Sequence, residues 1–127
     1  MKTKRPVPAL TAQELEIMKI VWDRRQATVR DVYEAMLEHR RIAYTTVLTL
    51  MNILYGKRRL KRHLAGRAHV YQAAEPKQRT IGRMVHEFLD RVFNGSAEPL
   101  LMHLAEEERL TPADLEELAQ AIRKKSS

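Results

Sequence analysis

The chain has 127 residues, of which 44% are hydrophobic, so it can form one ordinary domain or two very small ones, and wholesale disorder is excluded. It has no cysteine, which excludes disulfides, thiolate metal sites and cysteine nucleophiles, and no long apolar run, so we expect neither a signal peptide nor a transmembrane helix. Its formal net charge of +7 favours an anionic partner, with nucleic acid as the first candidate and an anionic membrane surface as the second.

The N-terminal residues predict an arm followed by two helices. Residues 1–9 are expected to form a flexible basic arm, because two prolines block regular structure. A helix is expected to follow Thr11, which can form a capping box with Glu14. A second helix is expected to follow Thr28, with Asp31 in its first turn, where the helix dipole favours a negative charge.

The third segment, Ala43 to about Tyr55, has two different faces. One face is apolar at helical spacing, which predicts a buried stripe made of Val47, Leu50, Met51 and Leu54. The other face carries no charge, and short side chains of this kind let a helix backbone approach the base edges in the major groove. Asn52 can bond an adenine edge there. The predicted base-reading residues are Thr45, Thr46, Leu48, Thr49 and Asn52.

A basic stretch surrounds and follows this helix. Between His39 and Ala74 there are eight Lys or Arg residues and no carboxylate. Two strand-like runs, 60–64 and 67–72, flank Gly66 and predict a β-hairpin. Three helices and a basic hairpin follow one another in this order in a winged helix-turn-helix. The predicted phosphate or wing contacts are Arg41, Tyr44, Lys57, Arg58, Arg59, Lys61, Arg62, Arg67, His69 and Tyr71, and for the two tyrosines a packing role stays open.

The composition changes after residue 75. Residues 1–75 hold 15 Lys+Arg and 7 Asp+Glu, a net charge of +8, whereas residues 76–127 hold 8 and 9, a net charge of −1. Three amphipathic helices are expected in the second part, with Ser96 capping the second and Thr111 the third. About 50 residues cannot easily bury three apolar faces, so self-association is expected. The predicted dimerisation residues are Ile81, Val85, Phe88, Leu89, Val92, Leu100, Leu101, Leu104, Leu115, Leu118 and Ile122.

Signatures of catalysis and of metal binding are missing from the sequence. The four glycines are isolated, so they form no phosphate-binding loop, and no serine sits in a nucleophile elbow. The five histidines show no recognisable ligand spacing. We therefore expect neither an enzyme nor a cofactor or metal site.

Four motifs carry a resemblance to a known family. They are Leu10-Thr11-x-x-Glu14-Leu15-Glu16-Ile17-Met18-x-x-Val21-Trp22, Ala43-Tyr44-Thr45-Thr46-Val47-x-Thr49-x-x-Asn52, Leu60-x-Arg62 and Gly66-Arg67-Ala68-His69-Val70-Tyr71. Over residues 10–125 the chain resembles the penicillinase-repressor family of the BlaI/MecI type. The resemblance implies a mainly α fold with a small β-hairpin wing, with a winged helix-turn-helix DNA-binding domain at residues 10–75 and a helical dimerisation domain at 76–127.

The resemblance also implies a function. Similar proteins are dimeric bacterial transcriptional repressors that bind inverted repeats in promoters, so double-stranded DNA and a second copy are the expected partners, and the cytoplasm, with nucleoid association, is the expected location. In the family the residues matching Thr45, Thr46 and Thr49 face the major groove, and the hairpin is the wing. The runner-up is a non-sequence-specific nucleic-acid or nucleoid-binding protein, and the third alternative is a helical interaction protein with an incidental basic face.

Two further points follow from the resemblance. Several members are released from DNA when a membrane-bound metalloprotease sensor cuts their C-terminal domain, so such a sensor is a further candidate partner. The matching position here is His103-Leu104, where the best-known members have Asn followed by Phe. Similar chains also often have a glycine near the end of the third helix, where this chain has Arg58.

Overall fold

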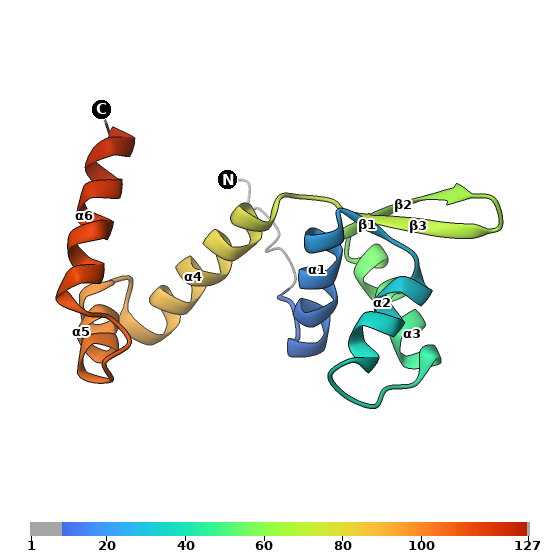
Figure 1. Ribbon diagram of the computed structural model, residues 1–127, viewed down its shortest axis with the longest axis horizontal. Coiled ribbons are helices and arrows are strands. Elements are labelled where there is room, and N and C mark those ends of the chain that lie inside the picture. The colour runs from blue at the N-terminus through green and yellow to red at the C-terminus, as the bar shows by residue number, and fades with distance from the viewer. Residues whose placement is uncertain (1–8, 127) are drawn as a thin grey trace, which may run out of the picture. The chain divides into compact units, whose positions relative to one another are not determined.

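The computed structural model describes residues 9–126, so the predicted arm lies outside the described residues except for Ala9. The chain divides into two compact units, Met1–Thr80 and Ile81–Ser127, which are described separately. Figure 1 shows the elements in chain order: α1 (Ala12–Arg24), β1 (Gln26–Ala27), α2 (Val29–Leu37), α3 (Tyr44–Gly56), β2 (Leu60–Ala65), β3 (Ala68–Ala73), α4 (Lys77–Phe93), α5 (Glu98–Glu106) and α6 (Pro112–Ser126).

The first unit combines three helices with a small antiparallel sheet of strand order β1-β3-β2. The predicted hairpin is confirmed, and its strands are paired from Leu60↔Ala73 to Ala65↔Ala68. Gly66 begins the two-residue turn with a φ of +67°, a backbone conformation that residues with a Cβ rarely adopt. The hairpin extends away from the three helices (Figure 1). The two-residue strand β1 was not predicted, because two residues carry no readable periodicity.

The core of this unit lies where the three helices meet the sheet. The predicted stripe of α3 is buried at Val47, Met51 and Leu54, while Leu50 is half-buried. Because one face of α3 is fixed against the core in this way, its opposite face points to solvent. The other buried apolar residues are Ile17, Met18, Val21, Ala27, Val29, Val32, Met36, Leu60 and Tyr71.

Helix starts agree with the expected capping residues, with one exception. Both halves of a capping box are present at Thr11 with Glu14 and at Thr28 with Asp31. The backbone N–H of Thr28 donates to the Asp31 carboxylate at 3.0 Å and lowers the pKa of that group. Thr111 caps α6 as expected. The prediction for Ser96 is wrong, because α5 is preceded by Ala97 and its first turn has no side-chain cap.

The end of α3 is closed by two backbone hydrogen bonds. The N–H of Arg59 donates to the carbonyl of Leu54 at 2.9 Å, and the N–H of Arg58 donates to Tyr55 at 3.0 Å. This pattern requires a residue in the left-handed backbone conformation just after the helix. That residue is Arg58, which has a φ of +63°. Gly56, which could adopt that conformation freely, lies inside the helix instead, and a Cβ at this position would meet nothing within 4 Å.

One substitution at each of these two positions is expected to stabilise the protein. Arg58→Gly removes the left-handed strain, and Gly56→Ala removes a helical glycine, so each raises the free energy of unfolding by about 0.5–1 kcal/mol. Urea unfolding followed by circular dichroism measures both changes. A lower unfolding midpoint for Arg58→Gly would contradict the geometry described for this turn.

The second unit consists of α4 after its first turn, α5 and α6. The helix α4 stops at Asn94 and Gly95, as expected, with the Gly95 N–H donating to the Leu89 carbonyl at 2.8 Å. Many apolar side chains of this unit remain exposed, which is described with the site below. Within the described residues, no helix combines the length and the apolar content needed to cross a membrane.

Candidate DNA-binding surface

The outward face of α3 presents short, uncharged side chains to solvent. All five residues that the sequence predicts for base reading, at positions 45, 46, 48, 49 and 52, are exposed. They share this face because the buried stripe of α3 fixes the rotation of the helix. A surface of hydroxyl, amide and methyl groups without charge matches the groups that base edges present in the major groove.

A groove of about 460 Å³ runs beside this face. It lies between the start of α2, the α3 helix and the hairpin, and Arg30 and Arg67 line it from opposite sides. Sequence reasoning missed Arg30, which lies outside the basic stretch and forms an exposed i,i+4 pair with Glu34. Only the fold shows that it faces the wing. The groove is lined by Thr28, Val29, Arg30, Tyr44, Leu48, Arg67, Ala68, His69 and Tyr71.

Tyr44 lies at the start of α3 and is held from α2. Its ring packs edge-on against Tyr33 with 5.3 Å between ring centroids, and the Arg30 guanidinium lies 5.9 Å from its centroid. The side chain remains partly exposed, with 39% of its surface accessible. Tyr44 therefore supports the start of α3 by packing on Tyr33, and it also presents its hydroxyl-bearing ring to the groove.

Two residues predicted as phosphate or wing contacts are buried. Arg59 is only 6% exposed, and its Nη1 donates to Glu75 Oε1 at 3.1 Å. Tyr71 is 1% exposed and belongs to the core. For Tyr71 this burial agrees with the packing role that the sequence left open, whereas for Arg59 the phosphate contact stays a prediction, although the protein covers most of its side chain.

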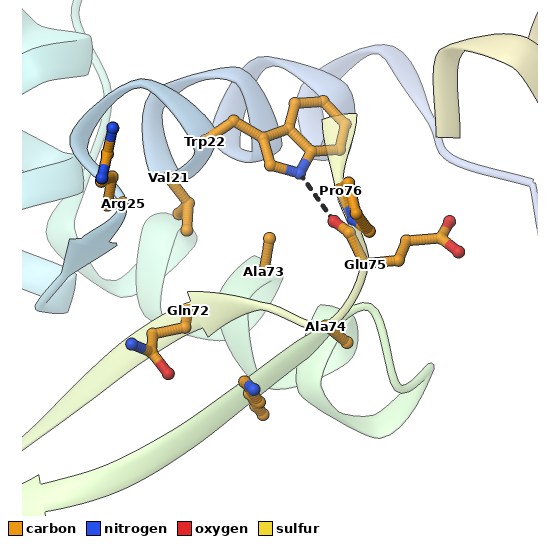
Figure 2. A pocket seen from close by; sticks show the side chains of 9 residues that line it. Val21, Trp22, Arg25, Gln72, Ala73, Ala74, Glu75 and Pro76 are labelled. Atoms are coloured by element: carbon orange, nitrogen blue, oxygen red, sulfur yellow. Dashed lines mark hydrogen bonds between the residues drawn. The ribbon is translucent and has the colours of Figure 1, made fainter. Parts of the chain in front are cut away.

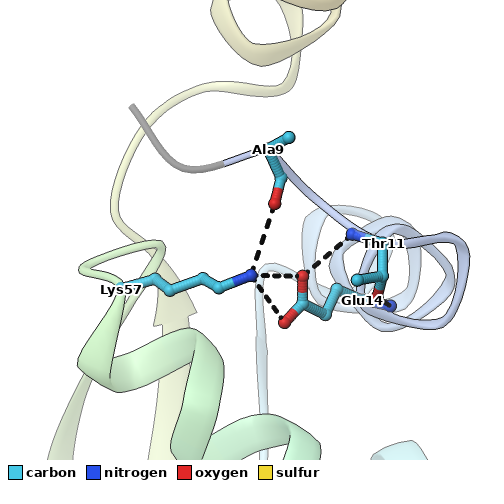
Figure 3. Close-up of polar contacts among 4 residues, drawn as sticks. All are labelled: Ala9, Thr11, Glu14 and Lys57. Atoms are coloured by element: carbon cyan, nitrogen blue, oxygen red, sulfur yellow. Dashed lines mark hydrogen bonds and ion pairs between the residues drawn. The ribbon is translucent and has the colours of Figure 1, made fainter. Parts of the chain in front are cut away.

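Lys57, which directly follows α3, forms an ion pair with Glu14 in the first turn of α1 (Figure 3). Its ammonium donates to both carboxylate oxygens of Glu14, at 2.8 and 2.9 Å, and to the carbonyl of Ala9 at 3.3 Å. Burial by itself raises the pKa of Glu14, but the bonds from Lys57 and Thr11 outweigh burial, and the pKa is lowered. In this structure the Lys57 ammonium is thus paired with Glu14 and stabilises the fold, and its contact with a phosphate stays a prediction.

The remaining predicted phosphate or wing contacts differ in their exposure. Arg62 is half-buried between β2 and α3, where its Nη1 donates to Asn52 Oδ1 at 3.4 Å and to the Tyr71 hydroxyl at 3.3 Å. The others are exposed and surround the outward face of α3 and the wing. They are Arg41, Arg58, Lys61, Arg67 and His69.

The connector between β3 and α4, residues 74–76, is held by contacts within the first unit. The Trp22 indole N–H donates to the carbonyl of Glu75 at 3.2 Å, beside a pocket of about 370 Å³ (Figure 2). The Glu75 side chain accepts from Thr80 at 2.6 Å as well as from Arg59. Because Thr80 is also buried, the first turn of α4 is held in the first unit by these contacts.

The second unit presents apolar side chains to solvent. Ile81, Leu89, Leu100 and Leu104 are half-buried. Within the described residues, the second unit has no buried apolar residue that could form a core of its own. The other predicted dimerisation residues are exposed: Val85, Phe88, Val92, Leu101, Leu115, Leu118 and Ile122.

The predicted cleavage position lies in α5. His103 is exposed and its Nε2 lies 3.2 Å from Glu107, one helical turn away, while Leu104 is half-buried. In the part of the chain that the structure describes, no group of three or more His, Asp or Glu side chains is arranged to hold a metal ion.

These features define a winged helix-turn-helix domain followed by a helical unit. The chain belongs to the penicillinase repressor family, whose family model matches residues 10–124. This is a family of transcriptional repressors rather than of enzymes, and the chain is accordingly a DNA-binding transcriptional repressor.

Individual proteins agree with this assignment. The penicillinase repressor of Bacillus licheniformis is 25% identical over 118 residues, which cover 93% of this chain and 92% of that protein. The transcriptional regulator BlaI of Mycobacterium tuberculosis is 32% identical over 103 residues, covering 80% and 75%. A solution structure of monomeric B. licheniformis BlaI in complex with the blaP half-operator has a TM-score of 0.50 and 25% identity, and it covers 57% of this chain and 89% of that one.

Proposed function

We propose that the protein is a dimeric, sequence-specific repressor that occupies an inverted-repeat operator in a promoter. The observation that carries this proposal is the exposed, uncharged face of α3 beside a groove lined by Arg30 and Arg67. In winged and other helix-turn-helix proteins such a helix enters the major groove. The proposed base-reading residues are Thr45, Thr46, Leu48, Thr49 and Asn52.

The proposed phosphate contacts are exposed side chains that can donate a hydrogen bond or carry a positive charge. Arg67 lies in the turn of the hairpin and Arg30 lies in the first turn of α2, so a DNA strand in the groove would meet a cation on each side. Such contacts hold the protein in register on the duplex without reading sequence. The proposed set is Arg30, Arg41, Tyr44, Arg58, Lys61, Arg67 and His69.

Dimerisation is proposed through residues 76–127. The apolar faces of α4, α5 and α6 are exposed in the single chain, and covering them with a second copy removes apolar surface from water. A two-fold dimer presents two α3 helices to two half-sites, which should lie one helical turn, or a multiple of a turn, apart. The related BlaI monomer bound to a half-operator is consistent with one protomer reading one half.

Release by proteolysis completes the proposal. The proposed cleaved bond lies between His103 and Leu104, the position that matches the cleavage site of similar proteins, and the proposed protease is a membrane metalloprotease sensor. Because both residues lie inside α5, that helix has to unwind locally before an extended segment can enter a protease. Cutting there separates α6 from α4 and removes part of the proposed dimer surface.

Substitutions on α3 are expected to separate base reading from general attraction to DNA. Asn52→Ala and Thr49→Ala should each reduce the preference for the operator over scrambled duplex by about 5- to 100-fold, since a direct contact to a base edge is worth about 1–3 kcal/mol. Competition binding with labelled operator, followed by fluorescence anisotropy, measures this preference.

Arg67→Ala is the matched control on the wing. It should weaken operator and scrambled duplex alike, and should reduce the slope of log K against log[salt] by about 0.9 for each phosphate that the protein no longer neutralises. A wild-type protein that binds both duplexes equally would favour the runner-up, a nucleoid-type binder without an operator. A protein that binds neither at physiological salt would contradict both functions.

A further inference from the structure

Arg62 connects the core, the wing and the outward face of α3. It pairs across the hairpin with Tyr71, so both side chains lie on the face of the sheet that packs on the helices. Its Nη1 donates to the buried Tyr71 hydroxyl at 3.3 Å and to Asn52 Oδ1 at 3.4 Å. Its guanidinium carbon lies 3.9 Å from the centroid of the Tyr55 ring. Stacking and hydrogen bonding together hold this guanidinium in one place.

The contact with Arg62 decides which way the Asn52 carboxamide points. A guanidinium has only donors, so the group of Asn52 that faces it has to be the carbonyl oxygen. The oxygen and the nitrogen of a carboxamide are bonded to the same planar carbon atom, so the contact that fixes the Asn52 oxygen also fixes the direction of its NH₂ group. The oxygen has two lone pairs and accepts only one bond from Arg62, so Asn52 still offers a donor and an acceptor side by side.

A carboxamide held in one orientation can read a base edge without first losing rotational freedom. In the major groove adenine presents the N7 acceptor next to the N6 amino donor, which matches the donor and the acceptor that Asn52 offers. The contact with Arg62 leaves both of these groups of Asn52 available and holds them in place.

We propose that Arg62 is a specificity-determining residue, which is held by Tyr71 and Tyr55 and fixes the Asn52 carboxamide in the orientation that reads a base edge. The inference rests on the proposed function, because it assumes that the face of α3 meets base edges. It replaces the expectation that Arg62 contacts a phosphate. In this role Arg62 is a positioning residue that acts on DNA through Asn52.

The test is selection of binding sites from a randomised duplex library by the full chain and four variants. Asn52→Ala identifies the base position that Asn52 reads, because the preference at that position disappears. Arg62→Met should reduce the preference at the same position by about fivefold or more, while leaving the other positions and the salt slope unchanged. Asn52→Ala/Arg62→Met should select the same motif as Asn52→Ala alone. Arg67→Met, on the exposed turn, is the control that changes the salt slope only.

Each outcome decides between roles for Arg62. If Arg62→Met lowers the salt slope by about 0.9 per protomer and leaves base preference intact, Arg62 is a phosphate contact and the inference fails. If Arg62→Met does not fold, Arg62→Lys retains the charge but not the planar stacking, and it should lose preference at the same position. If the wild type selects no motif, the proposed function fails together with this inference.

Discussion

Replacing Lys57 by methionine is expected to lower the free energy of unfolding of the first unit by about 2–4 kcal/mol. The side chain of Glu14 is only 3% exposed, and Lys57, at 25%, supplies both of its carboxylate oxygens with a donor. Removing one partner of a buried ion pair leaves the other charge buried without compensation, which is strongly destabilising. Urea unfolding of the full chain, followed by the fluorescence of Trp22 in α1, measures the effect in the first unit.

A second substitution tests this explanation. Glu14→Gln in the Lys57→Met background removes the uncompensated charge while retaining an acceptor for the Thr11 N–H, so most of the stability should return. Arg30→Met breaks an ion pair whose side chains are 68% and 60% exposed, and it should cost at most about 1 kcal/mol. Equal losses for Lys57→Met and Arg30→Met would contradict the role assigned to the buried pair.

The same pair predicts a dependence of stability on pH. Because the pKa of Glu14 is lowered in the folded protein, its carboxylate contributes stability that is complete above the ordinary value of 4.5 and is lost as the pH falls below it toward the folded-state pKa. The difference in stability between wild type and Glu14→Gln should therefore shrink below pH 4.5.

Placing a charge on the apolar face of α4 is expected to convert the proposed dimer into a monomer. Val92 is 50% exposed in the single chain, so Val92→Glu leaves the fold of each protomer intact but buries a carboxylate wherever two copies meet. Loss of the second half-site removes the gain from bivalent binding, and operator affinity should fall by about 100-fold or more. Sedimentation velocity and operator binding on the same sample measure both effects.

His86→Glu provides the matched control for this experiment. It adds a negative charge to the same helix at an exposed position that lies about 120° around α4 from Val92. The control should remain a dimer and should keep its operator affinity within a few-fold. A Val92→Glu protein that still sediments at twice the chain mass of 14.8 kDa would show that this face of α4 is not the dimer surface.

Most of the fold could be predicted from local patterns. Capping residues such as Thr11 and Thr28 mark helix starts because the side-chain bond spans only three residues. The stripe of α3 and the alternation in the hairpin are equally local, since burial of one face repeats at the period of each element. The exposure of the α3 face that we propose reads bases follows from the same periodicity.

The individual roles of the basic residues could not be predicted in this way. Arg59 forms a hydrogen bond with Glu75, which is 16 residues away in the sequence, and Lys57 forms one with Glu14, which is 43 residues away. A run of cations shows a net attraction for anions, but the direction of each side chain depends on such distant partners. Arg30 shows the converse, because only the packing of α2 beside the hairpin brings it to the groove.

Selection of binding sites from a randomised duplex library by the wild-type chain tests the central claim most directly. A dimer with two exposed α3 helices should enrich an inverted repeat whose half-sites lie one helical turn, or a multiple of a turn, apart. Asn52→Ala should lose the preference at one position in each half-site. An unenriched pool, or a motif without two-fold symmetry, would contradict the claim that this protein is a dimeric reader of a palindromic operator.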